Sequence, residues 1–111
     1  MGALAPITPT RTGVASAGAA VAASDTISVS AMGPHGALLE IINGNAAPDV
    51  MSISDASTTR TGAAATANAP SVTNGTSKIF SISRDQVDLA TGLVTVTHSV
   101  TTTVTYKLYP V

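Results

Sequence analysis

Alternation of apolar and hydroxyl side chains in the last twenty residues is the feature that most constrains the fold of this chain. Between Gly92 and Val111, β-branched, aromatic and aliphatic side chains recur at every second position: Val94, Val96, Val104, Tyr106 and Leu108. Threonine and lysine occupy the positions between them. A period of two places the apolar set on one face of a strand and the hydroxyls on the other. The pattern predicts half-buried strands in an antiparallel sheet with one face toward solvent.

Five further segments share this character and are separated by glycine, proline and asparagine. We expect strands over residues 26–31, 38–42, 50–54, 71–73 and 78–83, turns at Gly33–Gly36, Asn43–Gly44 and Asn74–Gly75, and a helical turn within 84–89. The side chains expected to face inward are Ile27, Val29, Met51, Ile53 or Val50, Phe80 and Ile82. Residues 55–69 lack an apolar period and are expected to form a long surface loop. Seven or so short strands are typical of an all-β fold, either an antiparallel β-sandwich or a small jelly-roll-like barrel.

The composition favours a single domain that associates with other subunits. The chain has 111 residues, which allows one core. Only 3% of the residues are aromatic and only 10% are charged, against about 25% charged in many soluble domains. Few large side chains are available for burial, and few charges cover the surface. A surface poor in charge suits a protein held permanently against neighbours.

Residues 1–24 are expected to form an extended N-terminal arm, followed by a β-sandwich domain over 25–111. Pro6 and Pro9 fix their own backbone angles and favour extended geometry in the residues before them. The simpler interpretation is a frayed terminus. The alternative is an arm that becomes ordered on a partner. We take as candidate contacts to a partner protein or to another protomer Leu4, Pro6, Ile7, Pro9, Arg11, Val14 and Tyr109.

Two further patterns near the N-terminus do not change this interpretation. The alanine-rich run over residues 14–24 lacks the leucines of a signal peptide and is too short to span a bilayer, so no membrane partner is expected. The tetrapeptide Thr10-Arg-Thr-Gly13 recurs as Thr59-Arg-Thr-Gly62. We attribute the repeat to the biased composition rather than to duplication.

No set of residues indicates catalysis, a cofactor or a metal. Asp85 and Asp88 are the only close acidic pair, and a solvated turn explains them better than a cation site. His98 is expected on the exposed threonine face of its strand, and His35 lies in a turn. The chain has no cysteine, nucleophile elbow or phosphate-binding glycine loop. With a net charge of -1 and scattered Lys and Arg, no nucleic-acid partner is expected.

Three segments resemble small virion proteins of tailed bacteriophages that decorate the capsid (cement or minor capsid proteins). They are Ala-Pro-Ile-Thr-Pro-Thr-Arg-Thr-Gly-Val14, Leu38-Leu-Glu-Ile-Ile-Asn-Gly44 and the closing Gly-Leu-Val-Thr-Val-Thr-His-Ser-Val-Thr-Thr-Thr-Val-Thr. The resemblance implies an all-β protein made in the host cytoplasm and bound to the outside of an icosahedral shell. It implies the major capsid protein as partner and association with itself as a homotrimer.

Two other classes of protein remain open at this point. A tail or head–tail connector component would share the β composition but would assemble into rings or tubes without capsid protein. A secreted adhesin-like or carbohydrate-binding module would also be rich in threonine, although sugar sites usually need exposed aromatic side chains, which are scarce here.

Overall fold

Strands make up the regular structure of this chain in a computed structural model that describes residues 2–15, 18–58 and 60–111. Two 3-10 helices, η1 (Val29–Ala31) and η2 (Arg84–Gln86), accompany the strands. The strands in chain order are β1 (Gly2–Ala3), β2 (Ala19–Ala20), β3 (Ser24–Ser28), β4 (Ala37–Asn43), β5 (Asp49–Ile53), β6 (Ser71–Val72), β7 (Ser77–Ile82), β8 (Leu93–His98) and β9 (Val104–Pro110).

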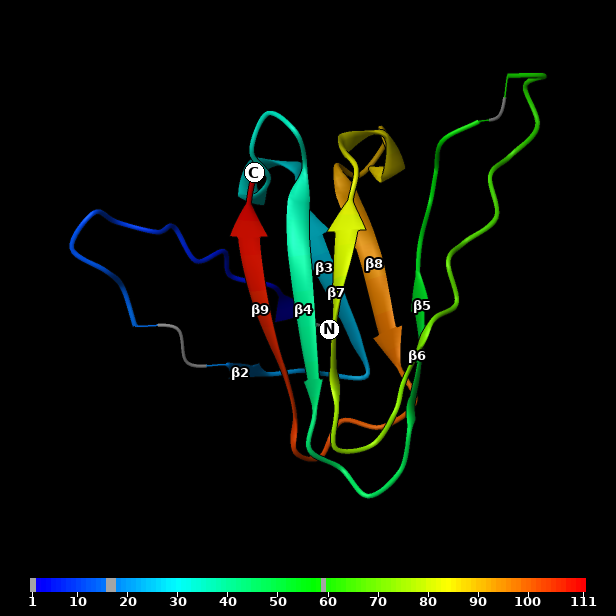
Figure 1. The fold of residues 1–111 in the computed structure, drawn as a ribbon. Coiled ribbons are helices and arrows are strands. Elements are labelled where there is room, and N and C mark those ends of the chain that lie inside the picture. The colour runs from blue at the N-terminus through cyan, green and yellow to red at the C-terminus, as the bar shows by residue number, and fades with distance from the viewer. Residues whose placement is uncertain (1, 16–17, 59) are drawn as a thin grey trace.

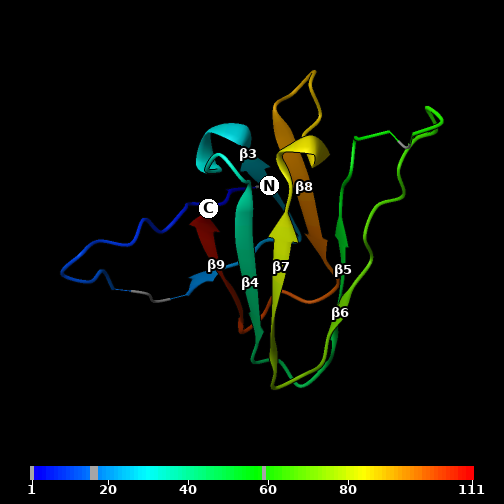
Figure 2. The ribbon, with the colours of Figure 1, turned by 45° about the horizontal axis from the view of Figure 1, so that its top comes forward.

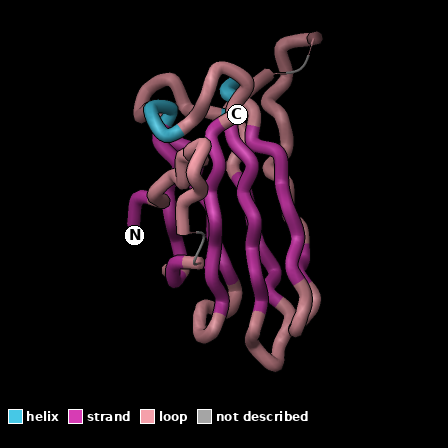
Figure 3. Tube along the Cα trace, turned by 60° about the vertical axis from the view of Figure 1, so that its left-hand side comes forward, coloured by secondary structure: helices cyan, strands magenta, loops and turns pink. Residues whose placement is uncertain are grey.

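The strands form two sheets that pack face to face, as Figures 1 and 3 show. Sheet A has the order β1-β3-β8-β5-β6, and sheet B has the order β2-β9-β4-β7. The paired strands run antiparallel, except that β1 runs parallel to β3. The expectation of an all-β fold with a sandwich arrangement is therefore confirmed.

The core follows the period of two that the sequence displays. Along β4 the side chains of Ala37, Leu39 and Ile41 are fully buried, while those between them are half-buried. The inward residues predicted for β8 and β9 are also buried: Val94, Val96, Val104, Tyr106 and Leu108. Full burial of each such aliphatic side chain contributes about 1.5–3 kcal/mol to folding, so the two inner faces hold the sheets together.

Several expected elements are present with altered limits. The predicted strand over 26–31 ends at Ser28, and Val29 is half-buried in η1 rather than inside the core. In β5 the inward side chains are Met51 and Ile53, whereas Val50 is 55% exposed. The helical turn expected within 84–89 is the short η2, which begins with a capping box formed by Ser83 and Gln86.

The turn after β4 is present, but its physical cause differs from the expected one. Neither Asn43 nor Gly44 has a positive φ. Asn43 is buried, its amide Nδ2 donates to the carbonyl oxygens of Ala47 and Val72, and its Oδ1 accepts from the backbone N–H of Asn45. The asparagine side chain therefore organises the turn through hydrogen bonds, and Gly75 is the residue that supplies a positive φ in the neighbouring turn.

Candidate functional site

Two segments extend away from the sandwich on opposite sides, as Figures 1 and 2 show. The first comprises residues 8–15, all of them exposed. The second is the loop between β5 and β6, which includes residues 56–58 and 60–67. Segments that project from a rigid scaffold often carry the contacts of a binding protein.

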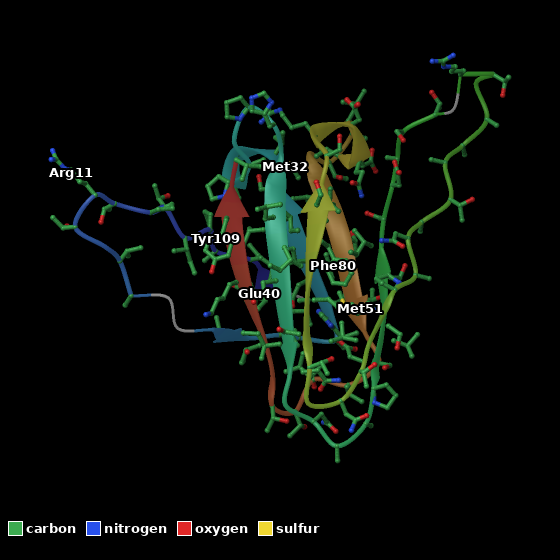
Figure 4. All side chains as sticks on the ribbon, in the orientation of Figure 1. Arg11, Met32, Glu40, Met51, Phe80 and Tyr109 are labelled. Carbon is green, nitrogen blue, oxygen red and sulfur yellow. The ribbon has the colours of Figure 1, made fainter. Side chains whose placement is uncertain are left out.

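Residues 8–15 are anchored at both ends to the outer edge of β9. Before the segment, the backbone N–H of Ile7 donates to the carbonyl oxygen of Leu108 at 2.6 Å. After it, β2 pairs with β9, and the N–H of Val21 donates to the carbonyl oxygen of Val104 at 3.3 Å. Figure 4 shows Arg11 at the outer end of the segment. The segment is thus an exposed loop tied at its base.

The predicted contact residues do not all lie on the surface. Leu4 is 6% exposed and belongs to the core of its own chain, so in this conformation its side chain is closed to a partner. Ile7 is half-buried, while Arg11 and Val14 are exposed. Among the remaining candidates, Pro6 and Pro9 are exposed and Tyr109 is half-buried.

The N-terminal residues pack more closely on the sandwich than an independent arm would. β1 pairs with β3, and the N–H of Leu4 donates to the carbonyl oxygen of Thr26 at 2.8 Å. The N–H of Ala5 donates to the hydroxyl of Tyr106 at 2.9 Å. Tyr106 therefore does two things: its ring fills the core, as expected, and its hydroxyl holds the N-terminal segment. The division of the chain at residue 24 stays a prediction.

The second segment is a hairpin-like extension of β5. The N–H of Ile53 and the N–H of Asn68 each donate to the other residue's carbonyl oxygen, at 2.7 and 3.0 Å. Farther out, the N–H of Ala65 donates to the carbonyl oxygen of Ser57 at 3.0 Å. The expected surface loop is therefore present and is partly ordered by its own backbone. The repeated tetrapeptides lie one in each segment, although Thr59 lies outside the described residues.

The outer face of sheet B carries large apolar side chains beside two opposite charges. On this face Glu40 of β4 lies opposite Lys107 of β9 on one side and Ile79 of β7 on the other. Leu38 and Tyr109 form the next row toward the C-terminus. Ile79 is 63% exposed, and the others are half-buried. Figure 4 shows Glu40 and Tyr109 on the strands of this sheet.

A shallow depression of about 380 Å³ lies on sheet A, with Asp55 and Asp88 in its lining. Both carboxylates are engaged in local turns: Asp55 Oδ1 accepts from the N–H of Ser57 at 2.9 Å, and Asp88 Oδ1 accepts from the N–H of Ala90 at 3.0 Å. These hydrogen bonds account for both aspartates as turn residues. Asp85, the other member of the acidic pair in the sequence, lies in η2 and is exposed.

His98 is buried, contrary to the prediction that it lies on the exposed threonine face. Its position has the same parity as Val94 and Val96, so strand alternation directs its ring toward the core. There Nδ1 lies 2.6 Å from Oδ2 of Asp49, and the two side chains are 1% and 0% exposed. Asp49 Oδ1 also accepts from the N–H of Ser99 at 3.0 Å.

The burial of both residues could have been predicted from the sequence by counting alternate positions along each strand. Asp49 is two positions before Met51 and four before Ile53, so it shares their inward face. The pair ties the start of β5 to the end of β8, and its complete burial makes it part of the core.

Within the described ranges, no group of three or more His, Cys, Asp and Glu side chains is arranged to hold a metal ion. His35 is exposed in the turn before β4. No helix of the described part of the chain is long and apolar enough to cross a membrane. Comparisons of the chain with protein-family models, curated proteins and solved structures find no match.

Proposed function

We propose that the protein is a structural virion subunit that binds the outside of a tailed-phage capsid and stabilises the shell by bridging capsid subunits. The observation that carries this proposal is the exposed segment of residues 8–15, which projects from the sandwich and is anchored at both ends. The resemblance of the sequence to decoration proteins supplies the class of partner, the major capsid protein.

The geometry of this segment suits contact with a large rigid surface. Its two anchors on β9 restrict where the loop can move, and Pro9 restricts the backbone within it. Less conformational entropy is then lost when the segment docks, which favours binding. Arg11 and Val14 offer one charged and one apolar contact at the surface of the segment.

A single segment of this size binds weakly, but an icosahedral shell offers the same binding site many times. Many identical copies bound to one icosahedral particle each add a small free energy, and linked contacts add through multivalency. The low charge of the chain, with 10% charged residues, is consistent with a surface in permanent contact with other proteins. The sandwich then serves as the rigid body that holds the segment in place.

The test mixes the purified protein with empty shells assembled from the major capsid protein encoded in the same genome. We expect the protein to co-sediment with these shells. Arg11→Glu should weaken binding by about tenfold, because arginine anchors at interfaces commonly contribute more than 1 kcal/mol. Arg60→Glu is the matched control, since Arg60 occupies the same tetrapeptide in the other projecting segment.

Three results would count against the proposal in different ways. Wild-type protein that stays in the supernatant at micromolar concentration refutes shell binding. Rings or tubes formed by the protein alone would indicate a tail or connector component instead. Equal shell occupancy for wild type and Arg11→Glu would remove residues 8–15 from the interface.

A further inference from the structure

Three of the four lateral edges of the two sheets are closed by two-residue strands. β1 covers the edge of β3, β2 covers β9 and β6 covers β5. Short edge strands are one of the devices by which β proteins prevent edge-to-edge pairing with other chains. In the described part of the chain the fourth edge has no such strand. It is β7, the last strand of sheet B, with six residues (Figure 2).

The hydrogen-bonding groups on the open side of β7 can be assigned from the register. The N–H of Asn43 donates to the carbonyl oxygen of Thr76 at 2.9 Å, so bonded pairs between β4 and β7 recur at every second residue from there. The N–H groups and carbonyls of Lys78, Phe80 and Ile82 therefore face β4. Those of Ser77, Ile79 and Ser81 face away, and none has a hydrogen-bond partner among the described residues.

The side chains of β7 do little to protect this edge. Ile79 is 63% exposed on the outer face of the sheet, and Phe80 is half-buried on the inner face. The strand contains no proline, and its pairing with β4 runs without a bulge. Lys78 is the only charged residue, and its Nζ donates to the carbonyl oxygen of Ser71 at 2.7 Å, so it is held against its own chain.

We propose that β7 pairs antiparallel with β7 of a second copy of this chain, across a two-fold axis at Ile79. Each Ile79 then lies opposite Ile79 of the partner subunit, and Ser77 lies opposite Ser81 of the partner subunit. All three outward-facing residues are used, which gives about six backbone hydrogen bonds. The two sheets B become one continuous sheet, and the pairing covers the exposed Ile79 side chains on its outer face.

The self-complementarity of the strand identifies the second copy as the occupant. In the register centred on Ile79, Lys78 lies opposite Phe80 of the partner subunit, so no like charges meet. Moving the axis to Lys78 would place the two lysines opposite each other and leave fewer outward groups paired. A two-fold interface requires one patch to match itself, and the register centred on Ile79 is the one that pairs all three outward-facing residues within β7.

The experiment measures the mass of the full chain in solution by analytical ultracentrifugation from about 1 to several hundred micromolar. We expect the wild type to approach twice the 10.9 kDa chain mass as the concentration rises. Ile79→Lys should stay at the single-chain mass, because pairing would place the two introduced charges opposite each other. Val50→Lys is the matched control, because Val50 is also exposed but lies on β5 of the other sheet, and this variant should dimerise like the wild type.

A second variant separates the edge from folding. Ile79→Pro removes one outward-facing N–H without removing a hydrogen bond to β4, so it should remain folded by circular dichroism and be monomeric. Slower amide exchange at Ser77, Ile79 and Ser81 with rising concentration would support the pairing directly. A wild type that stays monomeric, a dimer that persists in Ile79→Lys, or the trimer that the phage resemblance implies would each overturn it. Shell binding is measured separately and does not depend on this result.

Discussion

Removal of the Asp49 carboxylate tests the buried pair at the junction of β5 and β8. In Asp49→Ala the His98 ring loses its partner at 2.6 Å, and the backbone N–H of Ser99 loses an acceptor at 3.0 Å. Both side chains of the pair are at most 1% exposed, so water does not readily replace these bonds. Each buried donor or acceptor that is left without a partner costs about 1–3 kcal/mol, so losing both hydrogen bonds costs about 2–6 kcal/mol.

The size of this effect is large relative to the stability of a domain of this length. A chain of 111 residues is expected to unfold with a free energy of about 5–15 kcal/mol. Asp49→Ala should therefore remove a substantial part of it. Asp49→Asn should cost less, about 1–2 kcal/mol, because its carbonyl oxygen can still accept the Ser99 N–H. The expected order of stability is wild type, then Asp49→Asn, then Asp49→Ala.

Urea unfolding followed by far-UV circular dichroism measures these differences. With a urea dependence of about 1–1.5 kcal/mol per molar, the midpoint for Asp49→Ala should fall by at least about 1.3 M. Asp85→Ala removes an exposed aspartate and should change the free energy of unfolding by no more than about 0.5 kcal/mol. An Asp49→Ala midpoint within about 0.5 M of the wild type would refute the reasoning.

Two further predictions concern the backbone and the N-terminal residues. Gly36→Ala should destabilise the fold more than Gly62→Ala, because both positions have a positive φ but a Cβ at Gly36 would lie 2.0 Å from the carbonyl oxygen of Ile82, whereas a Cβ at Gly62 meets nothing within 4 Å. Equal thermal midpoints for the two variants would contradict this. Leu4→Ala should lower the free energy of unfolding by about 2–4 kcal/mol, as for other buried leucines, while Val14→Ala should leave it within about 0.5 kcal/mol. A small effect of Leu4→Ala in urea unfolding would show that the N-terminal segment is not part of the core.

Strand alternation could be predicted from the sequence wherever the apolar side chains are β-branched and the segment is long. β4, β8 and β9 follow their patterns closely, since one face of each is buried and the other is not. The residues at which strands and helices begin and end were harder to predict from the sequence. Val29 continues the alternation of β3, yet the chain turns into η1 there because the side chain of Ser28 accepts from the N–H of Ser30 and caps the helix.

The buried polar residues were the hardest part of the core to predict, because their residue types suggest exposure. His98 and Asp49 are titratable types that are usually exposed, and only their parity relative to neighbouring apolar residues places them inside. Asn43 has the same property: it has the parity of Leu39 and Ile41, and its amide replaces the backbone bonds missing at the turn. The tertiary partners of these groups come from distant segments, so a local pattern indicates burial without identifying the partner.

Low charge and edge protection are linked in this fold. A sheet edge is commonly guarded by charged side chains, by proline or by short covering strands. This chain has five Lys and Arg residues in total, and Lys78 is the only one that lies on β7. Covering strands therefore carry the protection: the N-terminal residues supply β1 and β2, and the loop after β5 leads into β6. The N-terminal residues thus close one edge of each sheet, with β1 before the exposed segment of residues 8–15 and β2 after it. Leu4 directly follows β1 and is buried, whereas Arg11 lies in the exposed segment between the two strands. Within the described residues no strand covers the outer edge of β7, and the pairing with a second copy that we propose would protect it.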